Sequence, residues 1–122
     1  MEDKEAIIQV ALDYIEGWYQ GNDSRMNQAL YDKLIKRRIL PTGESWEVNR
    51  DWMVEATRNG KGTIEKPERG RKEITILDKT ETMGSIRIVS NEFIDYLHVV
   101  KVNGKWIIAN VLWDYLLNKV KS

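Results

Sequence analysis

Cysteine is absent from this sequence of 122 residues, and histidine occurs once, as His98. Without cysteine there is no disulfide framework, no thiolate nucleophile and no zinc site built on sulfur. A single histidine without an Asp/Glu cluster at ligand spacing also predicts no metal site, and we expect no cofactor. With no matching Ser and Asp arrangement, we expect no hydrolytic triad either.

Excess charge and long apolar runs are missing too. Nineteen basic and nineteen acidic residues cancel, so no overall field draws the protein to nucleic acid or to an anionic membrane. No apolar run approaches the ~20 residues of a membrane span. The charged start, Met1–Glu5, leads into a helical pattern and not into a signal peptide. We expect one cytoplasmic domain over residues 1–122, with neither nucleic acid nor membrane as partner.

The most informative stretch surrounds Asn103-Gly104, between two runs rich in β-branched and aromatic residues. Asn-Gly favours a type I′ hairpin turn because both central residues need positive φ. An unbroken register then predicts the pairs Val102–Lys105, Val100–Ile107 and Leu97–Asn110.

This register sorts the hairpin into two faces, since successive strand residues point to opposite sides. The predicted inner face carries Phe93, Asp95, Leu97, Val99, Trp106, Ile108, Asn110 and Leu112. The predicted outer face carries Ile94, Tyr96, His98, Val100, Ile107, Ala109, Val111 and Trp113. Neither face alternates with charge, as a half-solvated sheet would. We therefore expect the outer face to be buried in a homodimer, through Ile94, Tyr96, His98, Val111 and Trp113.

Helical periodicity dominates the first half of the chain. Residues 4–20 predict an amphipathic helix with Asp3 as N-cap and Gly21 as its stop. A short helix after Asp23 and a third helix between Asn49 and Gly60 follow. The third helix is expected to point Trp52, Met53 and Ala56 inward.

Strands dominate the second half. Lys33–Leu40 predicts a short strand, which Trp46 and Val48 extend into a ribbon. After a loop over residues 60–71, strands are expected at Glu73–Lys79 and Met83–Ser90, before the hairpin that runs to about Leu116. Helices first and four consecutive strands last predict an α+β fold, with the helices packed on one face of an antiparallel sheet.

Several segments also carry a family resemblance. They are Tyr14-Ile-Glu-Gly-Trp-Tyr-Gln-Gly-Asn-Asp23, Arg25-Met26, Ala29-Leu30, Lys36-Arg37, Phe93-Ile-Asp-Tyr-Leu-His98 and Lys101-Val-Asn-Gly-Lys-Trp106. Together they resemble the nuclear-transport-factor-2-like cone-fold superfamily, and within it the lumazine-binding branch. The resemblance implies three helices on a curved sheet of four main strands plus a short early ribbon. One departure is Tyr31-Asp32, where the family commonly has His-Pro, so that histidine's role is not carried over.

The resemblance implies that the interior of the cone serves as a pocket, since members of the superfamily isomerise, dehydrate, cyclise or only bind ligands. Asp95 is the most informative candidate, because Asp is disfavoured in a strand and a carboxylate in an apolar pocket can act as an acid or base. The full set of expected pocket residues is Tyr14, Trp18, Trp52, Asp95, Trp106 and Asn110. The basic cluster Lys33, Lys36, Arg37 and Arg38 is expected to be a solvated surface.

Three functions stay open at this point. The first is a protein that binds a flat aromatic or heterocyclic small molecule in the cone. The second is a lyase or isomerase in which Asp95 is the general acid or base and Tyr14 donates to a developing oxyanion. The third is a dimeric interaction module whose cone is filled by its own side chains.

Overall fold

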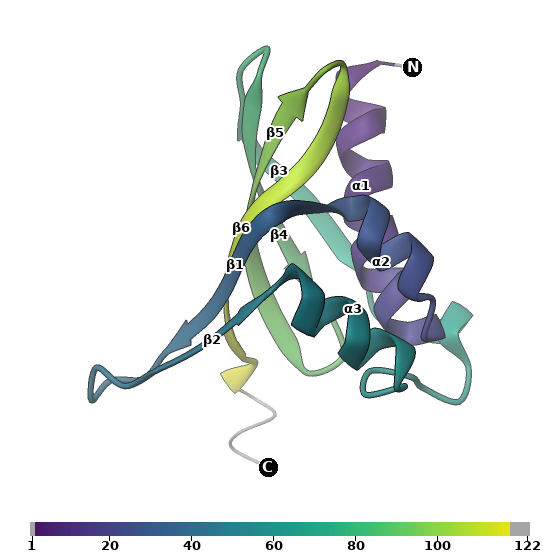
Figure 1. Cartoon of the computed structure of the whole chain (residues 1–122), viewed down its shortest axis with the longest axis vertical. Coiled ribbons are helices and arrows are strands. Elements are labelled where there is room, and N and C mark those ends of the chain that lie inside the picture. Colours follow the sequence, from purple (N-terminus) through teal and green to yellow (C-terminus); the bar gives the residue numbers. More distant parts are fainter. Residues whose placement is uncertain (1, 118–122) are drawn as a thin grey trace.

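The computed structural model describes residues 2–117. Its helices are α1 (Asp3–Gln20), α2 (Asp23–Ala29), α3 (Arg50–Arg58) and the short 3-10 helix η1 (Pro67–Arg69). Its strands are β1 (Leu30–Ile39), β2 (Ser45–Asn49), β3 (Glu73–Lys79), β4 (Met83–Val89), β5 (Phe93–Val102) and β6 (Lys105–Tyr115). These strands form one sheet in the order β2-β1-β6-β5-β4-β3 (Figure 1).

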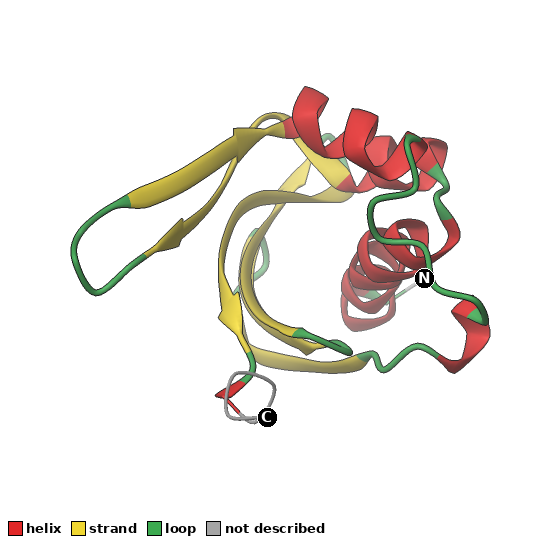
Figure 2. Ribbon diagram, turned by 90° about the horizontal axis from the view of Figure 1, so that it is seen from below, coloured by secondary structure: helices red, strands yellow, loops and turns green. Residues whose placement is uncertain are grey.

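The sheet is strongly curved, and the helices lie on its concave side (Figure 2). Strands β3 to β6 form the predicted antiparallel meander, so the α+β architecture is confirmed. The early ribbon, however, is not separate. Strand β1 follows α2 directly and pairs in parallel with β6, which makes the sheet mixed where a purely antiparallel one was expected. Strand β2 then pairs with β1 and extends the sheet beyond the helices.

Side-chain caps start the shorter helices. Asn49 accepts a hydrogen bond from the Trp52 backbone N–H at 2.9 Å, as predicted. Asn22 does the same for Arg25 at 3.1 Å, so the cap of α2 lies one residue before the predicted Asp23. Helix α1 begins after Glu2, and the predicted cap Asp3 is its first helical residue. These caps satisfy backbone donors that have no partner within the helix.

The hairpin turn is confirmed, with φ of 50° at Asn103 and 79° at Gly104. The predicted register of the hairpin is correct as far as Val99 and wrong from His98 onwards. Val99 pairs with Ile108, but His98 pairs with Asn110, so Ala109 is an extra residue in β6. Such a bulge bends a strand and increases its twist, as a curved sheet requires.

The bulge reverses the orientation of the rest of β6. Val111 is buried in the core, although it was predicted on the outer face. Asn110 and Leu112, predicted inside, are exposed. The inner face assigned to β5 is correct, because Leu97 and Val99 are fully buried.

The core fills the space between α1 and the sheet near the hairpin turn. Trp106 is buried there, and its indole N–H donates to the Asp3 carboxylate at 3.1 Å. Lys101 pairs with the same carboxylate at 3.2 Å, so Asp3 ties the start of α1 to both strands of the hairpin. Within residues 2–117, no helix combines the length and the apolar character needed to cross a membrane.

Candidate functional site

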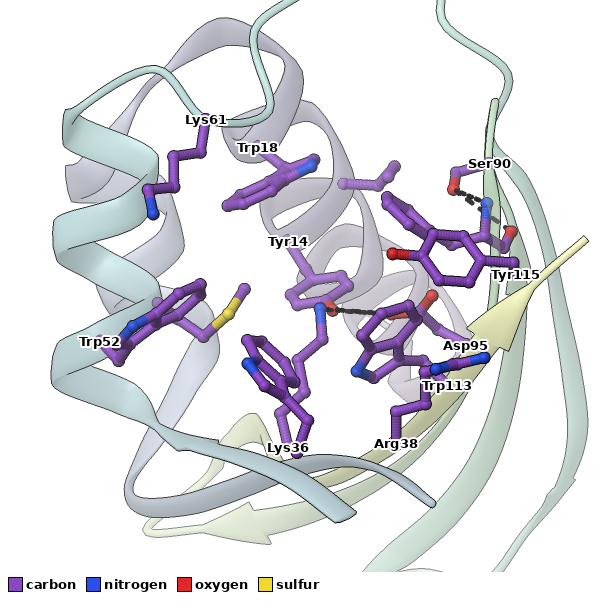
Figure 3. Close-up of a pocket in the computed structure, with 14 residues that line it drawn as sticks. Tyr14, Trp18, Lys36, Arg38, Trp52, Lys61, Ser90, Asp95, Trp113 and Tyr115 are labelled. Atoms are coloured by element: carbon purple, nitrogen blue, oxygen red, sulfur yellow. Dashed lines mark hydrogen bonds and ion pairs between the residues drawn. The ribbon is translucent and has the colours of Figure 1, made fainter. Parts of the chain in front are cut away.

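A cavity of about 490 Å³ lies between α1, α3 and the inner face of the sheet (Figure 3). This volume is within the range of small-molecule sites, which begins near ~300 Å³. Seven aromatic residues line it: Tyr14, Trp18, Trp46, Trp52, Phe93, Trp113 and Tyr115. Its charged residues are Lys36, Arg38, Lys61 and Asp95. The cone is therefore not filled by its own side chains.

Simple periodicities bring these side chains together. On α1, Tyr14 and Trp18 are four residues apart and share one face. Strands β1, β5 and β6 each contribute two residues spaced by two, which point to the same side of the sheet. They are Lys36 and Arg38 of β1, Phe93 and Asp95 of β5, and Trp113 and Tyr115 of β6, and β2 adds Trp46.

A hydrogen-bonded chain of three side chains forms the polar centre of the cavity. The Tyr14 hydroxyl donates to Asp95 Oδ2 at 2.7 Å, and Lys36 Nζ donates to the Tyr14 oxygen at 2.6 Å. Lys36 Nζ also lies 3.8 Å from Asp95 Oδ2, which makes a buried ion pair. The three residues come from α1, β1 and β5, so the chain links the helical layer to two strands.

Burial shifts the pKa values of Tyr14 and Lys36, two of the three hydrogen-bonded side chains. Burial raises the pKa of Tyr14 well above its usual value, and the negative charge of Asp95 acts in the same direction. Burial lowers the pKa of Lys36, and the attraction of the Asp95 carboxylate offsets only part of this effect. The phenol therefore stays protonated, while the amine is easier to deprotonate than an exposed lysine.

Aromatic rings surround the cations of the site. Lys36 Nζ lies 5.2 Å from the Tyr14 ring centre, 5.9 Å from that of Trp18 and 5.6 Å from that of Trp113. Arg38 lies over Tyr115 at 4.9 Å, and Lys61 lies over Trp52 at 5.3 Å. Such contacts hold cations in place within a largely apolar wall.

The aromatic rings also contact one another along the sheet side of the cavity. Trp46 makes edge-to-face contacts with Trp52 at 5.1 Å and with Trp113 at 5.7 Å. Trp113 contacts Phe93 and Tyr115, each at 5.2 Å. Edge-to-face is a favourable geometry for aromatic pairs, so these rings stabilise one another in the wall of the cavity.

Four of the six predicted pocket residues do line the cavity, namely Tyr14, Trp18, Trp52 and Asp95. The other two do not. Trp106 is buried in the core, at the opposite end of the hairpin from the cavity. Asn110 lies on the outer face, where its amide is 3.5 Å from His98 Nδ1, because the bulge at Ala109 turns it outward.

The sequence reasoning missed the cationic side of the site. Lys36 was assigned to a solvated basic cluster, yet its side chain is only 13% exposed. A signal was present in the spacing. Leu34, Lys36 and Arg38 occupy every second position of β1 and so share one face of the sheet, and Leu34 on that face is fully buried. Trp113 was assigned to the outer face by the unbroken register and instead lines the cavity.

The expected dimer face changes accordingly. Val111 and Trp113 do not belong to the outer face, whereas Tyr96, His98, Asn110 and Leu112 do and are exposed. Self-association through this face stays a prediction, which light scattering at micromolar concentration can test. Within residues 2–117, no group of three His, Asp or Glu side chains could hold a metal ion.

Solved structures with the same architecture define the class of the protein. An NTF2-like (nuclear-transport-factor-2-like) protein of unknown function from Methylobacillus flagellatus KT superposes with a TM-score of 0.76 at 19% identity, covering 93% of this chain and 92% of that chain. One from Shewanella baltica OS155 gives a TM-score of 0.73 at 18% identity, covering 93% and 94%. One from Silicibacter pomeroyi DSS-3 gives 0.74 at 14% identity, covering 95% and 100%. The fold is thus that of an NTF2-like protein.

Sequence comparison narrows this class to a family. The family model described as "Putative lumazine-binding" matches residues 2–114, nearly the whole chain. The protein belongs to this family, as its sequence segments predicted. No curated protein matches the chain.

Proposed function

We propose that this protein binds a flat heteroaromatic small molecule of about the size of lumazine in the cavity between α1, α3 and the sheet. One observation carries the proposal: a cavity of about 490 Å³ has aromatic walls around the Lys36–Tyr14–Asp95 chain. Aromatic walls provide stacking area for a flat ring, while a few convergent polar groups fix its orientation. The description of the family supports lumazine as the first probe.

The polar groups of the cavity complement such a ring. Lumazine has two carbonyl oxygens and ring nitrogens. Lys36 has three N–H donors and uses one of them on Tyr14. The Trp113 indole N–H is buried and has no hydrogen-bond partner among residues 2–117. An unpartnered buried donor costs about 1–3 kcal/mol, and a turn of the Trp113 ring toward a ligand oxygen would relieve this cost.

Titration with lumazine tests the proposal through tryptophan fluorescence. Trp18, Trp46, Trp52 and Trp113 line the cavity, so binding should quench most of the emission. Trp113→Ala should weaken binding about 2- to 12-fold, which corresponds to the 0.5–1.5 kcal/mol of an aromatic pair.

The matched control is Asn110→Ala, because Asn110 is exposed on the outer face of the same strand. The affinity of this variant for lumazine should equal that of the unmodified protein. No saturable quenching up to about 1 mM lumazine, where binding contributes only ~4 kcal/mol, would contradict the proposal.

A lyase or isomerase is the second candidate, and the Tyr14–Asp95 hydrogen bond favours it. A carboxylate at the wall of an apolar cavity is suitably placed to accept a proton from a bound substrate. Tyr14, however, already donates its proton to Asp95, so it can stabilise a substrate oxyanion only after that bond opens. Lys36 is therefore a better candidate than Tyr14 as the donor to an oxyanion.

A further inference from the structure

We propose that Lys36 is a nucleophile that forms a reversible imine with an aldehyde or ketone group on the ligand of this cavity. The inference rests on the function proposed above, because it assigns a covalent step to the same site. It also restricts the ligand that reacts to flat heteroaromatic molecules that carry an aldehyde or ketone group.

The position of the amine carries the first part of the argument. Lys36 projects from β1 into the cavity, and its Nζ lies within 6 Å of three ring centres, those of Tyr14, Trp18 and Trp113. Its side chain is 13% exposed, so the amine is largely shielded from water but still lines the open cavity. A flat ligand between these rings would bring an attached carbonyl carbon next to Nζ.

The hydrogen-bonded chain carries the second part, since imine formation requires a neutral amine. Lys36 donates to the Tyr14 oxygen at 2.6 Å, and Tyr14 donates to Asp95 at 2.7 Å. As Lys36 passes a proton to the Tyr14 oxygen, the Tyr14 hydroxyl can pass its own proton to Asp95. The result is a neutral amine, a neutral phenol and a protonated carboxyl group. Shielding from water lowers the cost of reaching this neutral amine from the charged pair.

The chemical step then balances. The Lys36 lone pair attacks the carbonyl carbon, the C=O π electrons move to oxygen, and one nitrogen proton moves to that oxygen to give a carbinolamine. The Asp95 proton, relayed through Tyr14, protonates the hydroxyl group. The nitrogen lone pair expels water and forms C=NH⁺. Overall an ammonium ion and a carbonyl compound give a protonated imine and water, with Asp95 again a carboxylate, which lies 3.8 Å from Nζ in the free protein.

The other charged groups around the cavity leave Lys36 as the best-placed nucleophile. Arg38 is paired with Asp114 at 2.8 Å and has no nucleophilic nitrogen at neutral pH. Lys61 lies over Trp52, and no carboxylate or phenol hydrogen-bonds to it among residues 2–117. The other titratable groups that line the cavity are Tyr14, Asp95 and Tyr115, and none of these side chains has an amine. The lowered pKa of Lys36, which burial causes, is consistent with this choice.

Reductive trapping with 6-formylpterin, a flat bicyclic heterocycle that carries an aldehyde, tests the inference. The unmodified protein is incubated with this compound and sodium cyanoborohydride, and the modified lysines are located by peptide mass spectrometry. Lys36 should be labelled in preference to Lys33, an exposed lysine on the same strand. Its labelling should persist at a lower pH than that of Lys33. Excess lumazine, which has no aldehyde, should protect Lys36 but not Lys33.

Two variants extend the test. Asp95→Asn removes the acid that protonates the departing hydroxyl group, so it should slow the loss of water and cause a loss of most Lys36 labelling, although Lys36 without this carboxylate deprotonates more readily. Lys33→Arg is the matched control, and its Lys36 labelling should equal that of the unmodified protein. If Lys36 is labelled no faster than Lys33 while lumazine still quenches the tryptophan fluorescence, the imine inference is wrong and the binding proposal stands. If lumazine neither quenches nor protects and Lys36 is not preferred, both are wrong.

Discussion

Replacing Lys36 with methionine should destabilise the fold, although the substitution removes an unusual buried charge. Asp95 would remain buried with the Tyr14 hydroxyl as its donor, without a cation to balance it. Removing one partner of a buried ion pair costs about 3–5 kcal/mol. The Lys36 and Asp95 side chains are 13% and 8% exposed and border a cavity that water can enter, so we expect the lower value of about 2–3 kcal/mol.

A double-mutant cycle isolates the interaction itself. Asp95→Asn should cost a similar amount, because it leaves the Lys36 ammonium without its carboxylate. The double variant Lys36→Met/Asp95→Asn buries no unpaired charge and should lose only about 1 kcal/mol. The coupling energy is then about 3–5 kcal/mol.

Urea denaturation at pH 7, followed by tryptophan fluorescence, measures these losses as changes in the midpoint at constant slope. In thermal unfolding, each kcal/mol should lower Tm by about 4 °C for a chain of this length. Asp32→Asn and Lys33→Met are matched controls at exposed positions of the same strand, and they should change stability by less than about 0.5 kcal/mol. The reasoning fails if the losses of the two single variants simply add in the double variant.

Three further predictions address neighbouring features. Gly62→Ala should displace Trp18, because the added Cβ would clash with the indole ring. The tryptophan emission maximum should shift and the affinity for lumazine should fall, and an unchanged spectrum would contradict the packing. Tyr14→Phe should flatten the alkaline loss of stability: above about pH 10 the unfolded chain ionises Tyr14 while the folded chain keeps the proton. The stability advantage of the unmodified protein over this variant should therefore shrink as pH rises, whereas parallel curves would refute the raised pKa. Asn49→Ala should cost about 1 kcal/mol by removing the cap of α3, and circular-dichroism melts that coincide with those of the unmodified protein would show that the cap is dispensable.

Local patterns predicted most of the fold. The Asn103-Gly104 turn, the cap at Asn49 and the strand Glu73–Lys79 depend on neighbouring residues only, and each was predicted correctly. The parallel pairing of β1 with β6 was not predicted, because it joins residues 75 to 78 positions apart and depends on where α2 places the start of β1. Pairings of that kind leave no periodic signal in either strand.

The site was predicted where it depends on one element and missed where it depends on several. Tyr14 and Trp18 follow from helical spacing, and Asp95 follows from its unusual position in a strand. Lys36 could not be recognised from its charge, because a lysine in a basic cluster is usually solvated. Its burial results from Tyr14 and Asp95, which two other elements bring to it. Trp113 was missed because a bulge has no reliable signature in a single sequence.

The bulge at Ala109 decides which side chains of β6 line the cavity. Every side chain of β6 from Asn110 to Tyr115 owes its side of the sheet to that one extra residue. Pairing without the bulge, with Ala109 kept in the regular alternation, would present Leu112 and Asp114 to the interior and Trp113 to solvent. Deleting Ala109 removes the extra residue itself, so Val111, Trp113 and Tyr115 should keep the inner face while β6 loses its bend. The chemistry of the cavity therefore depends on where β6 accommodates its extra residue as well as on which side chains β6 carries.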